Sequence, residues 1–165
     1  MSDIKVVFVD LDSTIIETRS GKTFPTCVLD FKPIWKVWKY IKQLNLTPDD
    51  YVFIVTNQGG IDFEDAYRKY LFTSKIACIC AALNEYLDLI VDYRVCFKND
   101  PDEALRRKPS PGMLSELIND YGLGDVPKSS ILMIGDASGK PGDFSDSDLM
   151  AAVNFGIKYL DVDDI

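Results

Sequence analysis

The amino-acid sequence predicts an α/β fold: a three-layer, Rossmann-like parallel sheet with helices on both faces, a small flap and no large cap domain. Two observations lead to this prediction. Short apolar runs alternate along the chain with segments whose apolar residues recur at helical spacing. Several of these runs are apolar at consecutive positions, as in strands that are buried on both faces of a parallel sheet. Such alternation is typical of strands linked by crossover helices.

The first half of the chain is expected to hold two strands and two helices. The strands cover residues 4–9 and 51–56, where large apolar residues follow one another. A helix between them should lie within residues 31–46, with Pro33 in its first turn. A second and longer helix should begin at Asp62, because aspartate is a favourable N-cap.

The second half is expected to add three strands and two helices. The strands cover residues 93–97, 130–135 and 157–162. One helix should begin at Pro111 and be closed by Gly122, because proline suits a first turn and glycine a C-terminal cap. The other helix should cover residues 146–156 and end at its glycine.

The composition is that of one ordinary domain. Of the 165 residues 47% are hydrophobic and 27% charged, so residues 1–165 are expected to form a single domain. No apolar run approaches the roughly 20 residues of a membrane span, and the N-terminus lacks a signal-peptide pattern. We therefore expect a soluble, intracellular monomer of the cytoplasm or nucleus, with no membrane partner. A net charge of −8 argues against a general nucleic-acid coat protein but leaves room for a local basic rim.

The absence of histidine limits the chemistry. Acid–base steps must use Asp, Glu, Lys, Tyr or Cys, which excludes histidine-based triads and histidine phosphoenzymes and disfavours zinc. The cysteines form no CxxC pair and lie in apolar surroundings, so we expect them to be reduced and buried; they are Cys27, Cys78, Cys80 and Cys96.

Polar motifs follow four of the predicted strands. The first strand leads into DLDST (10–14), the second into TNQGG (56–60), the third, through a loop, into RRKPSPG (106–112), and the fourth into GD (135–136). Each motif alone is common. Because the carboxyl ends of parallel strands meet in one crevice, we expect the four motifs to lie together.

Together the motifs supply what phosphoryl transfer to a carboxylate requires. Acidic groups can hold Mg²⁺, which prefers oxygen ligands. The metal and a lysine can neutralise phosphate charge, while a hydroxyl and an amide orient its oxygens. One aspartate can attack phosphorus and another can move a proton. Asp10 and Asp12 start on the same face of the strand, and a metal and a bound phosphate would offset their repulsion.

These motifs resemble, in order, those of the haloacid dehalogenase superfamily of phosphatases, and the resemblance covers nearly the whole chain. A closer similarity lies within it, to the phosphatase domain of polynucleotide kinase 3′-phosphatases. The segments that carry it are ETRSGKTFPT (17–26), TNQGGI (56–61), RKPSPGM (107–113) and GDASGKPGDFSDSD (135–148). The resemblance implies a haloacid dehalogenase-type fold.

The resemblance implies a role for each acidic residue of the motifs. Asp10 would be the nucleophile, and Asp12 the general acid and then the general base. Mg²⁺ would be held by Asp10, Asp136 and the backbone carbonyl of Asp12. Asp148 would assist the metal through water, with a simple first-turn acid of a helix as the alternative, and Asp143 is a weaker candidate.

The resemblance also implies which residues bind the substrate. Thr56 and Lys108 would be phosphate ligands, with Asn57 beside them. On the residues alone, Arg19 and Lys22 are expected to form a basic rim that contacts the polynucleotide, with solvated surface charges as the alternative.

Further basic and aromatic residues are candidates for a rim around the crevice. Arg107 and Lys140 could add to a basic rim, whereas we expect Arg106 to be a solvated charge. Phe24 could stack on a terminal base, whereas we expect Phe144 to lie in the core.

The sequence departs from the resembled family in three places. The loop over residues 139–143 is shorter than in the animal enzymes, and the basic residue that often follows TNQxGI is missing. No GxxxxGK[ST] phosphate-binding loop is present, so we expect phosphatase activity without kinase activity.

The leading hypothesis is a Mg²⁺-dependent DNA 3′-phosphatase that leaves a 3′-hydroxyl through an aspartyl-phosphate, in DNA end repair. Its partners would be DNA 3′-phosphate ends and unidentified repair or replication proteins. A small flap between Asp12 and Phe31 leaves the crevice open, which suits a phosphate at the end of a macromolecule. The alternatives are a small-molecule phosphatase of the histidinol- or heptose-phosphate type and a non-catalytic interaction module on the same fold.

Overall fold

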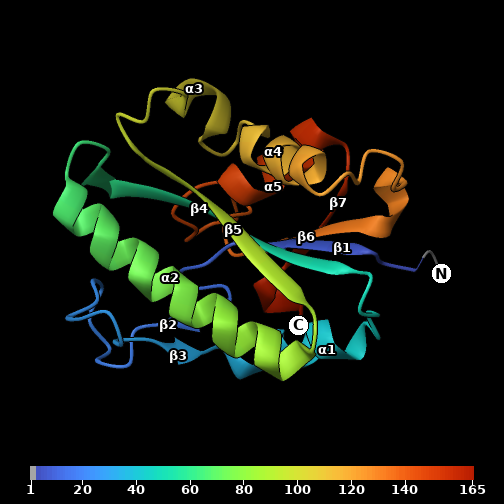
Figure 1. Cartoon of the computed structure of the whole chain (residues 1–165), viewed down its shortest axis with the longest axis horizontal. Coiled ribbons are helices and arrows are strands. Elements are labelled where there is room, and N and C mark those ends of the chain that lie inside the picture. The colour runs from blue at the N-terminus through green and yellow to red at the C-terminus, as the bar shows by residue number, and fades with distance from the viewer. Residues whose placement is uncertain (1–2) are drawn as a thin grey trace.

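The structure is a computed structural model that describes residues 3–165, so the first two residues of the predicted domain lie outside it. Its centre is a five-stranded sheet in which every neighbouring pair of strands is parallel, in the order β5-β4-β1-β6-β7 (Figure 1). The strands are β1 (Val6–Val9), β4 (Tyr51–Asp62), β5 (Ile90–Lys98), β6 (Ile131–Gly135) and β7 (Lys158–Asp161). The predicted parallel α/β sheet is confirmed.

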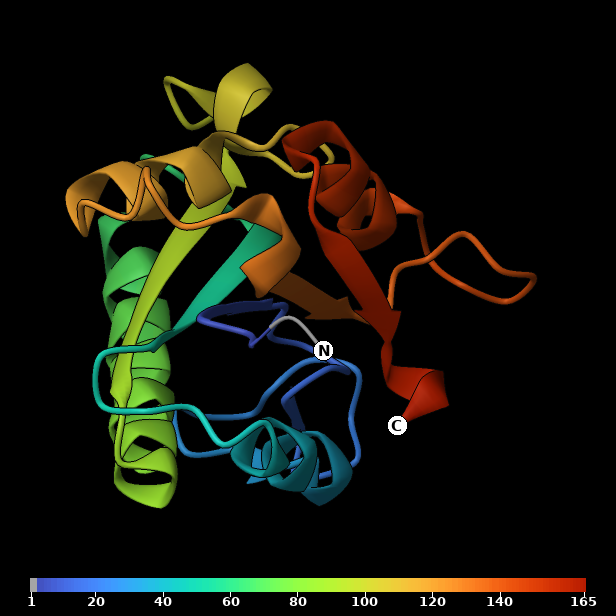
Figure 2. The ribbon, with the colours of Figure 1, turned by 90° about the vertical axis from the view of Figure 1, so that its right-hand side faces the viewer.

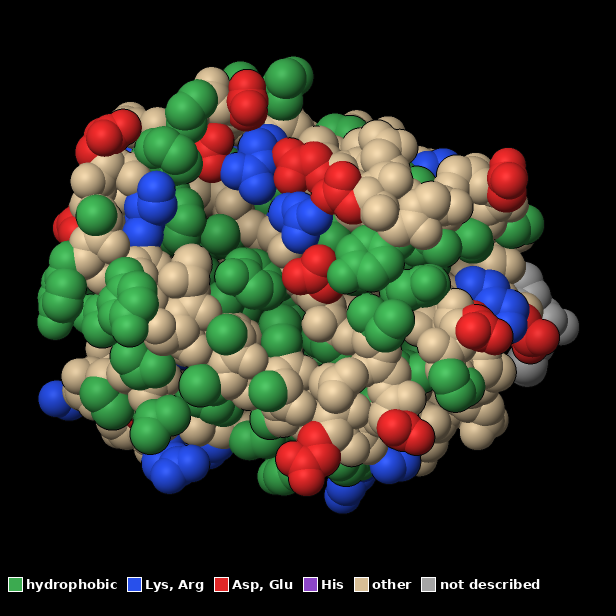
Figure 3. All heavy atoms as spheres, in the orientation of Figure 1, with side chains coloured by type: hydrophobic (Ala, Val, Ile, Leu, Met, Phe, Trp, Pro, Cys, Tyr) green, Lys and Arg blue, Asp and Glu red, His purple; other side chains and the backbone are tan. Residues whose placement is uncertain are grey.

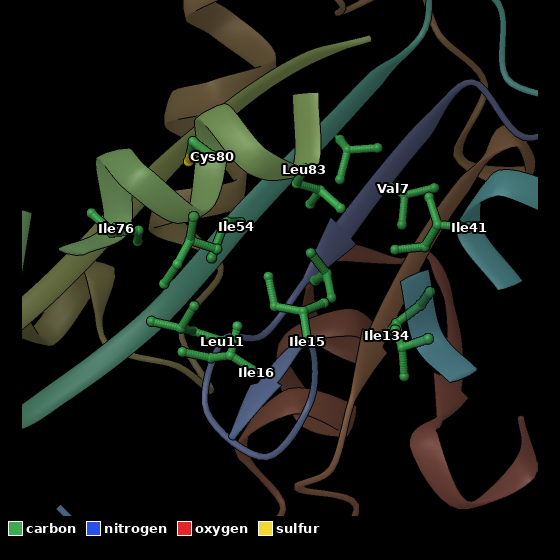
Figure 4. Close-up of a cluster of buried hydrophobic side chains, with 14 of the residues drawn as sticks. Val7, Leu11, Ile15, Ile16, Ile41, Ile54, Ile76, Cys80, Leu83 and Ile134 are labelled. Carbon is green, nitrogen blue, oxygen red and sulfur yellow. The ribbon is translucent and has the colours of Figure 1, made fainter. Parts of the chain in front are cut away.

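Four helices form the two outer layers. Helices α1 (Trp35–Gln43) and α2 (Ala66–Leu87) cover one face of the sheet, and α4 (Gly112–Asp120) and α5 (Ser147–Phe155) cover the other (Figure 2). Successive residues of a strand point to opposite faces, so β1 contributes to both layers. Its odd-numbered valines pack with α1 and α2, as Figure 4 shows for Val7, while Val6 and Phe8 pack with α4.

The predicted helix starts need two corrections. Asp62 ends β4 because the strand continues beyond the predicted residue 56 and pairs with β5 as far as Lys98. The N-cap of α2 is Asp65, whose carboxylate accepts from the backbone N–H of Arg68 at 2.9 Å. Pro33 lies in β3 and not in the first turn of α1, which begins at Trp35.

Two short strands form the base of a loop that covers the carboxyl end of β1. Strand β2 (Ile16–Glu17) pairs antiparallel with β3 (Lys32–Pro33), and residues 18–30 between them are called the flap below. The remaining short elements are α3 (Glu103–Arg106), η1 (Lys128–Ser130) and η2 (Val162–Asp164). Among residues 3–165 no helix is long and apolar enough to cross a membrane.

The cysteine prediction is half wrong. Cys80 and Cys96 are buried, as expected. Cys27 is exposed because it lies in the flap, and Cys78 is exposed because it faces solvent two positions before Cys80 on α2.

Candidate active site

A buried ion cluster lies at the carboxyl ends of β1 and β6. The ammonium Nζ of Lys108 lies 2.6 Å from Oδ1 of Asp10 and 2.6 Å from Oδ1 of Asp148. Asp10 follows β1, Lys108 follows α3, and Asp148 lies in the first turn of α5. All three are buried, so water screens their charges little. The fold therefore brings together residues that are far apart in the sequence.

A third carboxylate completes the cluster. Asp10, Asp136 and Asp148 each offer one oxygen, and these three oxygens lie within 4.8 Å of one another. The hydroxyl of the buried Thr14 lies 3.2 Å from Oδ1 of Asp136 and 3.4 Å from Oδ2 of Asp10, and its single proton is shared between these two acceptors. Three close carboxylates with one ammonium leave an excess of negative charge. An oxygen-only donor set with such an excess fits a hard divalent cation.

Burial dominates the pKa values in the cluster. Desolvation raises the pKa of Asp10, Lys108 opposes the rise, and the carboxylates of Asp148 and Asp136 add to it. Desolvation also raises the pKa of Asp136, followed by the charge of Asp148. For Lys108 desolvation acts to lower the pKa, but Asp10 and Asp148 outweigh it, so its pKa is raised. Added positive charge at this position would therefore favour the ionised carboxylates.

Asp148 reaches the cluster because residue 135 is glycine. A Cβ at Gly135 would collide with the carboxylate and Cβ of Asp148. The Asp148 carboxylate also accepts from the backbone N–H of Ala137 at 3.2 Å. Asp143, the weaker candidate, lies outside the cluster and accepts from the backbone of Ser138 and Lys140, each at 3.0 Å. The acidic residue of this motif that faces Lys108 is therefore Asp148.

The side chain of Asp12 lies apart from that of Asp10. Strand β1 ends at Val9, and the chain then turns through Ser13, whose φ is +61°. Asp10 is buried while Asp12 is exposed, and both residues line the cleft described below. The Asp12 carboxylate accepts from Nε2 of Gln58 at 2.9 Å.

The side-chain amides of Gln58 and Asn57, near the end of β4, make hydrogen bonds to other residues of the site. Nε2 of Gln58 also donates to Oγ1 of the buried Thr56 at 2.9 Å, which leaves the hydroxyl proton of Thr56 free to donate. The amide of Asn57 donates to the carbonyl of Lys108 at 2.9 Å and accepts from its N–H at 3.0 Å. Asn57 therefore holds the backbone that carries Lys108. No role for Gln58 was expected from the sequence.

An open cleft of about 760 Å³ lies over the cluster. Its lining joins the cluster to Asp12 and Asn57 and includes the side chain of Phe144. Phe144 is fully exposed, so its expected place in the core is wrong; it lies in the loop between β6 and α5.

The flap carries the predicted polynucleotide contacts. Arg19 and Lys22 are exposed, and within residues 3–165 neither side chain has an ion-pair or hydrogen-bond partner. Neither residue lines the cleft. The flap is held by Asp30, whose carboxylate accepts from the backbone N–H groups of Ser20 at 2.8 Å and Thr26 at 2.7 Å.

The other basic candidates are paired with carboxylates. Arg106 lies 2.7 Å from Glu116 and also contacts Asp100, so it is not the solvated charge that we expected. Figure 3 shows acidic and basic side chains intermixed over α3 and α4, where these pairs lie. The remaining pairs are Arg107 with Glu103, and Lys140 with Asp161. Arg19 and Lys22 are therefore the unpaired members of the predicted rim.

Comparison with known proteins places these features in context. Residues 5–164 match the family described as "Polynucleotide kinase 3 phosphatase". A relative in Schizosaccharomyces pombe, a bifunctional polynucleotide phosphatase/kinase, is 34% identical over 94% of this chain. The chain spans 36% of that relative's length.

A solved structure shares the fold. The D,D-heptose 1,7-bisphosphate phosphatase from B. bronchiseptica, complexed with magnesium and phosphate, superposes with a TM-score of 0.65. The match covers 94% of this chain and 79% of that one, at 21% sequence identity.

Proposed function

The chain belongs to the polynucleotide kinase 3 phosphatase family, and from this premise we propose that it is a Mg²⁺-dependent phosphatase that removes 3′-terminal phosphate from DNA. The product would be a 3′-hydroxyl end, as DNA end repair requires. The observation that carries the proposal is the buried pairing of Lys108 with Asp10 and Asp148 beside a third carboxylate, beneath an open cleft. We propose that the protein acts on these ends as a monomer.

In the first step, Asp10 acts as the nucleophile. A carboxylate oxygen of Asp10 bonds to phosphorus as the bond between phosphorus and the 3′-oxygen breaks. Asp12 gives its proton to the departing 3′-oxygen. Its exposed position on the cleft, outside the ion cluster, suits contact with a leaving group. Lys108 and the free hydroxyl proton of Thr56 stabilise the phosphoryl oxygens.

In the second step, water opens the aspartyl-phosphate. Asp12, now ionised, takes a proton from the attacking water, and the bond between Asp10 and phosphorus breaks to release phosphate. Gln58 donates to Asp12 and so fixes its carboxylate for both proton transfers. The same side chain therefore acts as acid and then as base.

Asp10, Asp136 and Asp148 would hold Mg²⁺ with the backbone carbonyl of Asp12, and the oxygen-only donor set of the three carboxylates fits this ion. When bound, the ion supplies positive charge that neutralises the phosphoryl oxygens. A polymeric substrate is supported by the cleft, because no residue of the flap is part of its lining.

The test compares four phosphorylated substrates at equal concentration. Phosphate release is measured from a 3′-phosphorylated oligonucleotide, from the same oligonucleotide phosphorylated at its 5′ end, and from heptose and histidinol phosphates. We expect Mg²⁺-dependent release from the 3′ end, abolished by EDTA and restored by Mg²⁺. Faster release from the small phosphates would favour the small-molecule alternative. Absence of release from all of them would favour the non-catalytic alternative.

A further inference from the structure

A second cavity, of about 420 Å³, opens from the catalytic cleft beneath the flap. We call it the flap cavity; it is lined by flap residues 24–28, by residues 57–61 at the end of β4, and by α2 from Arg68 to Lys75. It shares Asp12 with the catalytic cleft, so the proposed proton donor stands where the two spaces meet. A group that leaves phosphorus past Asp12 would therefore enter the flap cavity.

A buried lysine without a partner faces this cavity. Lys75 is only 6% exposed and lies on the buried side of α2 with Phe72, Ile76 and Ile79. Within the described chain, no carboxylate or carbonyl accepts a hydrogen bond from its ammonium. The ammonium itself is not enclosed, since among residues 3–165 the buried side-chain polar atom without a hydrogen-bond partner is Oδ2 of Asp161. Because Lys75 lines the flap cavity, its ammonium is available to pair with an anion that enters this cavity.

The rest of the lining indicates what kind of anion this is. The walls are largely apolar, with Phe24, Val28, Leu71 and Phe72 among them. The second cation of the lining is Arg68, which is exposed, and the acidic group of the lining is Asp12 at the junction with the cleft. Apolar walls with two cations suit a sugar and base joined to a phosphodiester, and do not suit a free sugar phosphate.

We propose that the flap cavity binds the 3′-terminal nucleotides of the leaving strand, with Lys75 paired to a backbone phosphodiester near that end. This inference rests on the proposed 3′-phosphatase function and adds to it a specificity-determining residue. Lys75 would act on the strand and not on the transferred phosphate, so substrates that lack a phosphodiester gain nothing from it. The cavity thus selects polynucleotides over small phosphates.

The test removes the two charges separately and together. The substitution Lys75→Met removes the positive charge from the protein. In the substrate, a 3′-phosphorylated oligothymidylate, a neutral methylphosphonate replaces the first or the second phosphodiester counted from the 3′ end and so removes a negative charge. For the wild-type protein we expect kcat/KM to fall about ten- to hundred-fold with the methylphosphonate at one of these linkages. Lys75→Met should show a similar fall on the charged substrate and no further fall on the neutral one.

Controls separate this role from a structural one. Hydrolysis of p-nitrophenyl phosphate should be unchanged in Lys75→Met, and Lys75→Arg should keep the response to methylphosphonate. Lys69→Met is the matched control, because Lys69 lies on the same helix with its ammonium 3.6 Å from the Phe63 ring and does not line the cavity. The melting temperature of Lys75→Met should be unchanged, because within residues 3–165 the Lys75 ammonium has no ion-pair or hydrogen-bond partner to lose. If Lys75→Met does not fold, the same measurements are made with Lys75→Gln.

Two results would overturn the inference: wild-type kcat/KM of Lys75→Met on the charged oligonucleotide, or a methylphosphonate penalty that persists in full in this variant. Failure of the proposed function would look different, as no phosphate release from any 3′-phosphorylated oligonucleotide. In that case fluorescence anisotropy measures the binding of a 3′-hydroxyl oligonucleotide with and without the methylphosphonate. Tighter binding of the charged strand by the wild-type protein, and not by Lys75→Met, would support the role of Lys75.

Discussion

The ion cluster and the flap are built in opposite ways. In the cluster, Lys108 bonds to residues 98 and 40 positions away, and Thr14 reaches one 122 positions away. In the flap, Asp30 bonds to residues only 10 and 4 positions away. The cluster rests on strands with no exposed surface, such as β1, whereas most flap residues are exposed. The geometry of the cluster thus depends on the whole fold, and that of the flap on one local carboxylate.

This difference implies that the ion cluster and the flap have different functions. Charges that are fixed by a rigid core need little reorganisation when phosphorus is attacked, which is the basis of electrostatic catalysis. A locally held flap can adjust to a polymer strand without disturbing those charges. Changes in the cluster should therefore affect every substrate alike, and changes in the flap should affect only long ones.

The largest effect is expected for Asp10→Asn. It removes the nucleophile and one carboxylate of the cluster, so turnover should fall by about a thousand-fold or more on oligonucleotides and on p-nitrophenyl phosphate alike. Circular dichroism should show an intact fold. Asp49→Asn, at an exposed position before β4, is the matched control and should keep full activity. Retention of more than about a hundredth of wild-type activity would contradict covalent catalysis by Asp10.

The second largest effect is expected at Asp12, where one substitution should distinguish formation of the aspartyl-phosphate from its hydrolysis. Asp12→Asn keeps the backbone carbonyl but loses the proton shuttle, so oligonucleotide turnover should slow by about 10²–10⁴-fold. Nitrophenolate needs no proton to leave, so p-nitrophenyl phosphate should rescue the first step alone. Rapid mixing should then show a burst of nitrophenol followed by slow turnover. No burst and an equal defect on all substrates would mean that Asp12 does not move protons.

The contrast also explains which parts of the structure could be predicted from the sequence. The strands of the parallel sheet could be predicted, because runs of consecutive apolar residues are typical of strands that are buried on both faces. Asp10, Lys108 and Asp136 could be placed near one another because motifs at strand ends share one edge. For Asp148 the sequence left two roles open, near the metal or as a first-turn acid, because its inward position depends on the space left by Gly135.

Other misses have equally local causes. Asp62 and Asp65 are both favourable caps, and only the pairing of Asp62 with Lys98 across β4 and β5 decides between them. Lys75 was missed although a signal exists: it lies at helical spacing from apolar residues that are buried on α2, among them Phe72 and Ile79. Phe144 was misplaced because hydrophobicity alone does not distinguish a core residue from an exposed loop residue at a cleft.

A smaller and substrate-dependent effect is expected for the double change Arg19→Ala with Lys22→Ala. Both side chains are unpaired and lie on the flap, outside the lining of the cleft. KM for an oligonucleotide should rise several-fold at low salt, and the slope of log KM against log salt should become shallower by about 1.4. Hydrolysis of p-nitrophenyl phosphate should not change. Lys39→Ala, exposed on α1, is the control, and an equal loss on both substrates would place the two residues within the catalytic centre.

The smallest effect concerns Asp30 and pH. The backbone N–H of Thr26 and the hydroxyl of Ser20 hold the pKa of Asp30 well below its usual value. An acid with a depressed folded pKa stabilises the flap fully above its unfolded pKa, about 3.9, and loses that contribution as pH falls through the folded value. NMR should therefore show the Asp30 carboxyl titrating well below 3.9, with the amide signals of Ser20 and Thr26 following it. Titration near the ordinary value, with amide signals that do not follow, would remove Asp30 as the organiser of the flap.

Asp30→Asn should reproduce the acid effect at neutral pH. The neutral amide accepts these hydrogen bonds more weakly than a carboxylate, so the amides of Ser20 and Thr26 should exchange faster with solvent. KM for an oligonucleotide should rise about two- to five-fold, the size of one or two weakened neutral hydrogen bonds, while kcat on p-nitrophenyl phosphate stays at the wild-type value. The sheet and the ion cluster do not rest on Asp30, so the melting temperature should hardly change. A fall in kcat on p-nitrophenyl phosphate would mean that the flap also orders the ion cluster. The ion cluster and the flap would then not be structurally independent of each other.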